Sequence, residues 1–197
     1  KWLLVVCFGY LGYKNARFGK IESHEAVTAM SRELMLQAKE VAEDMGFTVL
    51  HMYVDCLFVQ QEGFEMPSDF APLMNAIESK TGIPIALEGV FKWVAFLSSK
   101  RDARVPVPNQ YFGAFLDGGL KYRGIELRRR DTTTWIRKIQ LAVLNILAQA
   151  DATDELTDHI PTALAWVERA KRELKAGRVP VEDLIVRQKL SRVLDGY

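Results

Sequence analysis

The sequence is poor in cysteine, with only Cys7 and Cys56 among its 197 residues. Both stand in apolar runs and show no paired spacing, so neither a disulfide framework nor a zinc site is expected. This usage favours a reducing compartment and indicates that both residues pack in the protein interior. We therefore expect an intracellular, cytoplasmic protein.

Long apolar runs are also missing. The longest, WLLVVCFGYLGY, extends from residue 2 to residue 13, whereas roughly 20 apolar residues are needed to cross a bilayer. It lacks the flanks of a signal peptide, so no membrane partner is expected. The chain starts at Lys1 and enters this run at once, which indicates a piece of a longer protein. An apolar content of 49% is enough for one good core, or for one domain and part of another.

Net charge is small, at +1, but it is unevenly distributed. Residues 1–120 contain 11 Lys and Arg against 14 Asp and Glu, whereas residues 121–197 contain 15 against 11, so the two parts carry −3 and +4. A positive excess in the second part is a weak indication of a polyanionic partner for that part.

One acid, Asp55, interrupts an apolar strand pattern in the stretch HMYVDCLFVQQEG, residues 51–63. Alternation along a strand places it on the same face as Tyr53 and Leu57. A charge on a half-buried strand is costly unless a cation, a proton or hydrogen bonds compensate it. The pattern leaves two interpretations open, a turn or edge carboxylate and a metal ligand.

Periodicity and turn residues predict an α+β fold, with strands first and helices last. Asp55 should lie near the tip of a hairpin. Ser23 is expected to cap the long helix, Ser68 or Asp69 the next, and Asp131 or a following Thr the first C-terminal helix. The expected helices are the end of one within 1–13, then 24–45, 69–80, one from 131, 159–176 and a short one after Pro180; the expected strands are 47–54, 56–60, 85–90, 91–97 and 110–116, with a loop at 98–109.

Several separated stretches carry a common pattern. They are KWLLVVCFGYLGYKNARFGKIESHEAVTAMSRE, YVDCLFV, LEGVFKWVAFL with YFGAFLDGGLKYRGIELRRRD, and VPVEDLIVRQKLSRVLDGY. In this order they resemble four segments of family B DNA polymerases: the Lys-x3-Asn-Ser-x-Tyr-Gly segment, the Tyr-Gly-Asp-Thr-Asp-Ser hairpin, the Lys-Lys-Arg-Tyr region with Lys-Gly-x-Glu-x-x-Arg-Arg-Asp, and the thumb signature.

The resemblance implies an antiparallel palm sheet with packed helices, followed by a helical thumb. Residues 1–20 would be the end of a fingers helix and the entry to the palm, 21–130 the palm, and 131–197 an incomplete thumb. It also implies DNA-directed DNA synthesis, in replication or repair, by two-metal nucleotidyl transfer onto a primer 3′ end. A further acid of this family lies before the position of Lys1, so the fragment is expected to be inactive alone.

Positions that match the family's motifs give the expected site. Asp55 matches the second acid of the hairpin, which is catalytic and binds Mg²⁺, and Glu88 matches an accessory carboxylate near the same ions. Carboxylates suit such hard cations. Lys1 matches the lysine that contacts the triphosphate of the incoming dNTP. Expected DNA contacts are Tyr111, the nearby basic residues Lys100 and Arg101, and the run Arg128, Arg129 and Arg130.

By composition alone, that arginine run is more typical of a solvated charge cluster than of a recognition surface. The resemblance favours the second interpretation because it places the run beside the primer–template path. Phosphate contacts by Lys and Arg dominate such binding. Other thumb cations expected to contribute are Arg137, Lys138, Lys171, Arg172, Lys175 and Arg178. The implied partners are primer–template DNA, dNTP and the N-terminal remainder of the polymerase, in a cytoplasmic, nucleoid-associated location.

The chain also departs from the family pattern. Tyr53 replaces the first hairpin acid and Cys56 the serine, while Val5, Val6 and Phe8 replace polar residues after Lys1. Each change removes a polar contact near the nucleotide. Two hypotheses follow: a divergent but working polymerase, or a non-catalytic DNA-binding or assembly subunit built on a degraded polymerase fold.

Overall fold

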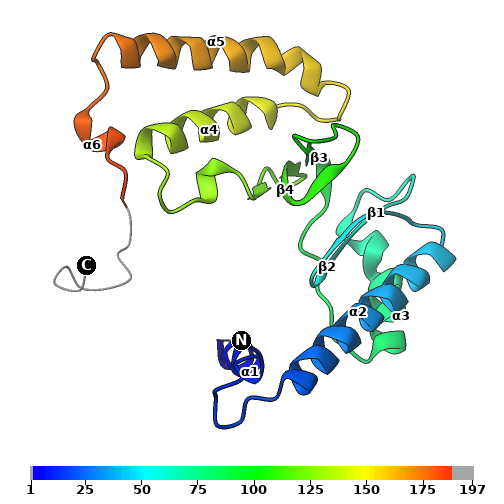
Figure 1. Ribbon diagram of the computed structural model, residues 1–197. Helices are drawn as coiled ribbons and strands as arrows, with labels where there is room; N and C mark the ends of the chain where they lie inside the picture. The colour runs from blue at the N-terminus through cyan, green and yellow to red at the C-terminus, as the bar shows by residue number, and fades with distance from the viewer. Residues whose placement is uncertain (1, 188–197) are drawn as a thin grey trace. The chain divides into compact units, whose positions relative to one another are not determined.

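The structure is a computed structural model that describes residues 2–187, and it divides into two compact units, residues 1–88 and 89–197 (Figure 1). Both units contain helices, and each has one small antiparallel sheet. The mixed helix and strand composition that the sequence predicts is therefore confirmed. The boundary between the units falls at residue 88, whereas the sequence patterns change from strand to helix near residue 130.

The first unit combines three α-helices with a two-stranded hairpin and one short 3₁₀ helix. Its elements, in order, are α1 (Trp2–Leu11), α2 (Ile21–Asp44), β1 (Thr48–Tyr53), β2 (Cys56–Gln60), η1 (Pro67–Phe70) and α3 (Ala71–Thr81). Ser23 is not the cap of the long helix, because α2 already begins at Ile21 and the Ser23 N–H donates to the Lys20 carbonyl. Asp69 does not cap α3 either. Its carboxylate accepts from the N–H groups of Glu65 and Met66 and so fixes η1.

Aromatic side chains form the core of the first unit where α2, the hairpin and α3 meet. The ring of Phe47 lies 5.1 Å from that of Phe64 and 6.1 Å from that of Phe70, between centroids. The buried residues of this unit are Ala38, Ala42, Phe47, Phe70, Leu73 and Ile77. The buried residues of α2, Ala38 and Ala42, lie in its second half, whereas Met30, in the first half, is 66% exposed.

The second unit consists of a three-stranded antiparallel sheet followed by helices. Its elements are β3 (Phe91–Ser98), β4 (Pro106–Phe115), β5 (Leu120–Arg123), η2 (Glu126–Arg128), α4 (Thr134–Leu147), α5 (Leu156–Lys175) and α6 (Val181–Leu184), and the strand order is β3-β4-β5. Strand β5 was not expected from the sequence. Conversely, the predicted strand at 85–90 is wrong, because Ile85 donates its N–H to the side chain of Glu78, at 2.7 Å, instead of to a neighbouring strand.

Strand β4 also begins earlier than expected. It starts at Pro106, inside the stretch predicted as a loop, and Ser98 faces Pro106 across the β3–β4 pair. The register is irregular between Phe96 and Ser98. A proline in a strand is tolerated at the first residue or at such an irregularity, because it has no N–H to contribute to the ladder.

Trp93 anchors the core of the second unit. It is 2% exposed, and its indole N–H donates to the Ala150 carbonyl at 3.2 Å. The preceding residue, Lys92, pairs with Asp151 at 2.6 Å. Consecutive strand residues point to opposite faces. Two neighbouring residues of β3 therefore hold two neighbouring residues of the α4–α5 connection.

The helices of the second unit follow the predicted capping in part. The Thr133 side chain accepts from the Ile136 N–H at 3.3 Å, which confirms a threonine cap after Asp131. Helix α5 begins at Leu156, three residues before the predicted start, and contains Pro161. On this helix Ala163 and Ala170 are buried, whereas Leu164 is 59% exposed. Across residues 2–187, no helix combines the length and the apolar character that crossing a membrane requires.

Candidate functional site

Asp55 lies at the tip of the β1–β2 hairpin. Tyr53 and Cys56 are Cα partners at the end of the ladder, so Val54 and Asp55 form a two-residue connection. The predicted place of Asp55 near the tip is confirmed, and the first strand ends one residue earlier than predicted. Both residues of the connection are exposed, and Val54 has a φ of +52°. A positive φ is strained for a β-branched residue, because its Cβ crowds the backbone. The hairpin thus presents one carboxylate to solvent on a strained turn.

The neck of the hairpin is apolar and aromatic. Tyr53, at the position of the family's first acid, is half-buried, with its ring 6.4 Å from that of His51 between centroids. The Cys56 thiol donates to the Tyr53 carbonyl at 3.1 Å. Among the described residues, none has a side chain that pairs with the Asp55 carboxylate. The acid is therefore available to a ligand that the chain does not itself supply.

Glu88 belongs to the same unit and is exposed at the end of the extended segment that follows α3. No group of three or more His, Cys, Asp and Glu side chains converges in the described part of the chain. Asp55 and Glu88 are oxygen donors of the kind that Mg²⁺ prefers, and two carboxylates completed by waters and substrate phosphates form a usual donor set for this ion. The residues present fit part of a magnesium site. Lys1 lies outside the described residues.

In the second unit, the β3–β4 connection carries Lys100 and Arg101, both exposed. The next arginine, Arg104, is already paired, with its guanidinium 3.0 Å from the Asp102 carboxylate. Hydrogen bonds from Arg104 lower the pKa of Asp102 below its ordinary value, and the bond from the side chain has a larger effect than the bond from the backbone N–H. This loop therefore combines one internally neutralised arginine with two cations exposed to solvent.

Tyr111 does not lie on an exposed surface. It is 3% exposed on the central strand β4, with its ring 5.7 Å from that of Phe96 between centroids, and it faces Arg123 across the β4–β5 pair. A side chain with so little accessible surface has almost nothing to offer to DNA. The expected direct contact along the DNA backbone does not agree with this burial.

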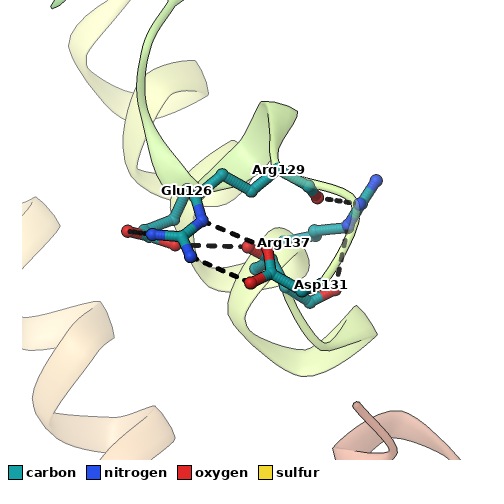
Figure 2. A network of polar contacts seen from close by, with 5 residues as sticks. Glu126, Arg129, Asp131 and Arg137 are labelled. Atoms are coloured by element: carbon teal, nitrogen blue, oxygen red, sulfur yellow. Dashed lines mark hydrogen bonds and ion pairs between the residues drawn. The ribbon is translucent and has the colours of Figure 1, made fainter. Parts of the chain in front are cut away.

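The three consecutive arginines are exposed but differ in their partners, and Figure 2 shows those of Arg129. Arg129 makes a bidentate pair with Asp131, at 3.1 Å from Nε and 2.9 Å from Nη2, and its Nη1 lies 3.2 Å from a Glu126 carboxylate oxygen. Neither Arg128 nor Arg130 has a carboxylate partner among the described residues.

Arg137, on the first turn of α4, also contacts the segment that contains the three arginines. Its Nε donates to the Thr132 carbonyl at 3.2 Å, and its Nη2 donates to the Arg129 carbonyl (Figure 2). The side-chain hydrogen bonds of Arg129 lower the pKa of Asp131, and those of Asp131 raise the pKa of Arg129. Residues 126–137 thus form a cross-linked turn, which we call the arginine turn.

Gly124 sets the entry to the arginine turn. It has a φ of +64°, and a Cβ at this position would lie 2.0 Å from the Asn109 carbonyl oxygen. Only glycine can meet both conditions, because any other residue would clash with strand β4. The close approach brings the chain between β5 and η2 against the backbone of β4.

Sequence reasoning missed Glu126 and Asp131 as partners and assigned Arg137 to DNA. The available signal was local: an acid two residues after Arg129 and another three residues before it. Two other expected thumb cations are also paired within the chain, Lys138 with Asp183 at 2.6 Å and Lys171 with Glu168 at 2.6 Å. A basic residue count therefore overstates the cations available to DNA.

These features are those of an α+β protein. Among the described residues, the carboxylate at the hairpin tip of the first unit has no side-chain partner, and several basic side chains of the second unit have no carboxylate partner. The model of DNA polymerase family B matches residues 5–197, so the chain belongs to that family. The family resemblance expected from the sequence is confirmed.

Individual relatives agree with this assignment. The chain is 27% identical to DNA polymerase 2 of Aeropyrum pernix over 192 residues, which cover 98% of this chain and 22% of that protein. It is 34% identical to DNA polymerase 2 of Saccharolobus solfataricus over 125 residues, covering 64% and 18%. The solved family B DNA polymerase of Pyrobaculum calidifontis superposes with a TM-score of 0.63 at 27% identity, covering 96% and 22%. The chain spans about a fifth of the length of these relatives.

Proposed function

We propose that this chain is part of a DNA-directed DNA polymerase that extends a primer 3′ end by two-metal nucleotidyl transfer. Residues 1–20 would end a fingers helix and enter the palm, residues 21–130 would form the palm, and residues 131–197 would form part of the thumb. The observation that carries the proposal is the exposed carboxylate of Asp55 at a hairpin tip, with no side-chain partner among residues 2–187, in a chain that matches family B across residues 5–197.

Asp55 is the proposed catalytic ligand, and Glu88 is the proposed accessory ligand. When bound, Mg²⁺ supplies activation of the primer hydroxyl and neutralises charge on the leaving pyrophosphate. The chain's own contribution is a carboxylate that no described cation neutralises, held on a two-residue connection that restricts its position. The hairpin therefore presents negative charge where a divalent ion can bind.

Basic residues are proposed to bind the phosphates. Lys1 would contact the triphosphate of the incoming dNTP, to which an ammonium group offers a compact positive charge. Lys100, Arg101, Arg128 and Arg130 would contact phosphates of the primer–template duplex, because they are exposed and lack a carboxylate partner among the described residues. Tyr111 would act indirectly, by supporting the sheet that carries these residues. The proposed location is the cytoplasm, at the nucleoid.

The test is primer extension by the full-length protein carrying Asp55→Ala. Extension should fall by roughly a hundredfold or more, because a metal ligand contributes several kcal/mol to such a transition state. Asp44→Ala is the matched control: Asp44 is an exposed acid at the end of α2 in the same unit, and it should leave extension unchanged. Extension by Asp55→Ala within a few-fold of wild type would refute the assignment.

A second function is favoured by one specific observation. Tyr53, Val5 and Val6 stand where the family pattern has polar residues, and Tyr53 packs against His51 at the neck of the hairpin. On this alternative, the protein is a non-catalytic DNA-binding or assembly subunit. It predicts salt-sensitive duplex binding without extension. Measured Mg²⁺-dependent extension above background by the wild-type protein would dispose of it.

A further inference from the structure

The three adjacent arginines of the arginine turn, residues 128–130, differ in whether they are paired with carboxylates. Arg129 meets both Asp131 and Glu126 (Figure 2). Among the described residues, no carboxylate pairs with Arg128 or Arg130. A guanidinium that already makes a bidentate carboxylate pair has little of its charge and few of its donors left for a phosphate. The three arginines are therefore unequal as DNA ligands.

We propose that Arg129 is a positioning residue, and that its pair with Asp131 holds the arginine turn so that Arg128 and Arg130 meet the DNA phosphates. The proposal rests on the proposed function, since it concerns how the same basic run engages DNA. It assigns to Asp131, an acid beside a polyanion, a role that favours DNA binding.

The contacts on both sides of the turn support this role. Leu127, one residue before Arg128, is 9% exposed and anchors the turn, and Arg137 donates to the carbonyls of Arg129 and Thr132. The backbone between Arg128 and α4 is thus held by a buried apolar group, a salt bridge and two side-chain to backbone hydrogen bonds. Groups that are ordered before binding lose less conformational entropy when they bind.

Charge alone predicts the opposite result. Asp131→Asn adds one unit of positive charge next to the proposed DNA path and releases Arg129. If Arg129 contacted phosphate directly, or if only net charge mattered, this change would tighten DNA binding. If Arg129 positions the turn, the same change loosens Arg128 and Arg130 and weakens binding.

The experiment measures the affinity of the full-length protein for a fluorescein-labelled primer–template duplex by anisotropy, over a series of salt concentrations. Asp131→Asn should weaken binding by about two- to tenfold, which is the range expected when one or two side chains must be ordered on binding. The slope of log K against log salt should remain that of the wild type, because no phosphate contact is removed. Asp131→Glu, which retains a carboxylate, should recover most of the lost affinity.

Glu173→Gln is the matched control. Glu173 pairs with Arg169 on α5, at 3.1 Å, so this variant also adds one positive charge and releases one arginine. It should leave binding unchanged or tighten it slightly. Thermal unfolding by circular dichroism checks that every variant is folded, and the double variant Arg129→Gln with Asp131→Asn should bind no more weakly than Arg129→Gln alone.

Two results would overturn the proposal. One is tighter binding by Asp131→Asn, as in the charge control. The other is a fall of about 0.9 in the salt slope for Arg129→Gln, which would mark a direct phosphate contact. Either result leaves the proposed function intact. By contrast, a wild-type protein that shows no salt-dependent duplex binding would remove the DNA-binding function itself, and this proposal with it.

Discussion

The tip of the β1–β2 hairpin and the arginine turn differ in whether their charged side chains are paired. At the hairpin, one exposed carboxylate has no cation beside it among the described residues, and the backbone at Val54 is strained. In the arginine turn, Arg129 pairs with the carboxylates of Asp131 and Glu126, and Arg137 donates to the backbone carbonyls of Thr132 and Arg129. The difference teaches that paired charges in this chain hold its structure, whereas unpaired charges are the ones available to ions and phosphates from outside.

The largest expected effect comes from neutralising the unpaired acid. Asp55→Asn keeps the size of the side chain and removes its charge, so Mg²⁺-dependent extension should fall by roughly a hundredfold or more. Duplex affinity, measured by anisotropy, should change less than about twofold, because no phosphate-binding cation is lost. Asp131→Asn should show the reverse order, with binding affected more than the chemical step. If both variants affected extension more than binding, or both affected binding more than extension, the proposed difference between the hairpin tip and the arginine turn would be contradicted.

Removal of the two unpaired arginines should have the next largest effect. Arg128→Gln and Arg130→Gln should each weaken duplex binding about tenfold at low salt, as expected for a hydrogen bond to a charged group. Each should also lower the salt slope by about 0.9. The measurement is the same salt series as above. A slope that does not change in either variant would show that these cations, although unpaired, do not contact phosphate.

A smaller effect is expected at the strained residue of the hairpin. Val54→Gly should stabilise the protein by about 1 kcal/mol, because glycine adopts a positive φ without the Cβ penalty and only part of the gain is lost to backbone entropy. Chemical denaturation of wild type and variant measures this difference. Val59→Gly, within β2, is the control and should destabilise the protein. Loss of stability in Val54→Gly would indicate that the valine side chain makes contacts that outweigh the strain.

The smallest effect concerns pH. The folded-state pKa of Asp131 lies below its ordinary value because Arg129 hydrogen-bonds the charged form. Its contribution to stability is therefore fully present above the ordinary Asp pKa and is lost as pH falls through the lower folded value. Unfolding temperatures measured between about pH 5 and pH 3 should converge for wild type and Asp131→Asn as the acid becomes protonated. A difference that stays constant over this range would contradict the ion-pair role.

Local signals in the sequence predicted much of the fold. The hairpin with Asp55 at its tip and the threonine cap of α4 both depend on interactions within a few residues. The errors in the strands of the second unit involve partners that are distant along the chain. Residues 85–90 have the composition of a strand but form none, although Val90 accepts from the Leu116 N–H at 2.9 Å, whereas β5 is short and is defined by its pairing with β4.

The same distinction applies to the site. The exposure of Asp55 followed from its place in a two-residue connection, but the burial of Tyr111 depends on Phe96 and on the sheet around it. The partners of Arg129 are close in sequence, yet a run of three arginines looks uniform until the backbone direction at each residue is known. Residue type identified the charges, and only three-dimensional pairing separates those used internally from those left available.

Lys92 and Trp93 attach the α4–α5 connection of the second unit to its sheet. These neighbouring residues of β3 hold Asp151 and Ala150, so the connection between α4 and α5 is fastened to the sheet by an ion pair and an indole hydrogen bond. The α4–α5 connection is therefore attached to the sheet at two consecutive residues of β3. A displacement of this connection away from β3 would break both contacts, so we expect the two elements to move together.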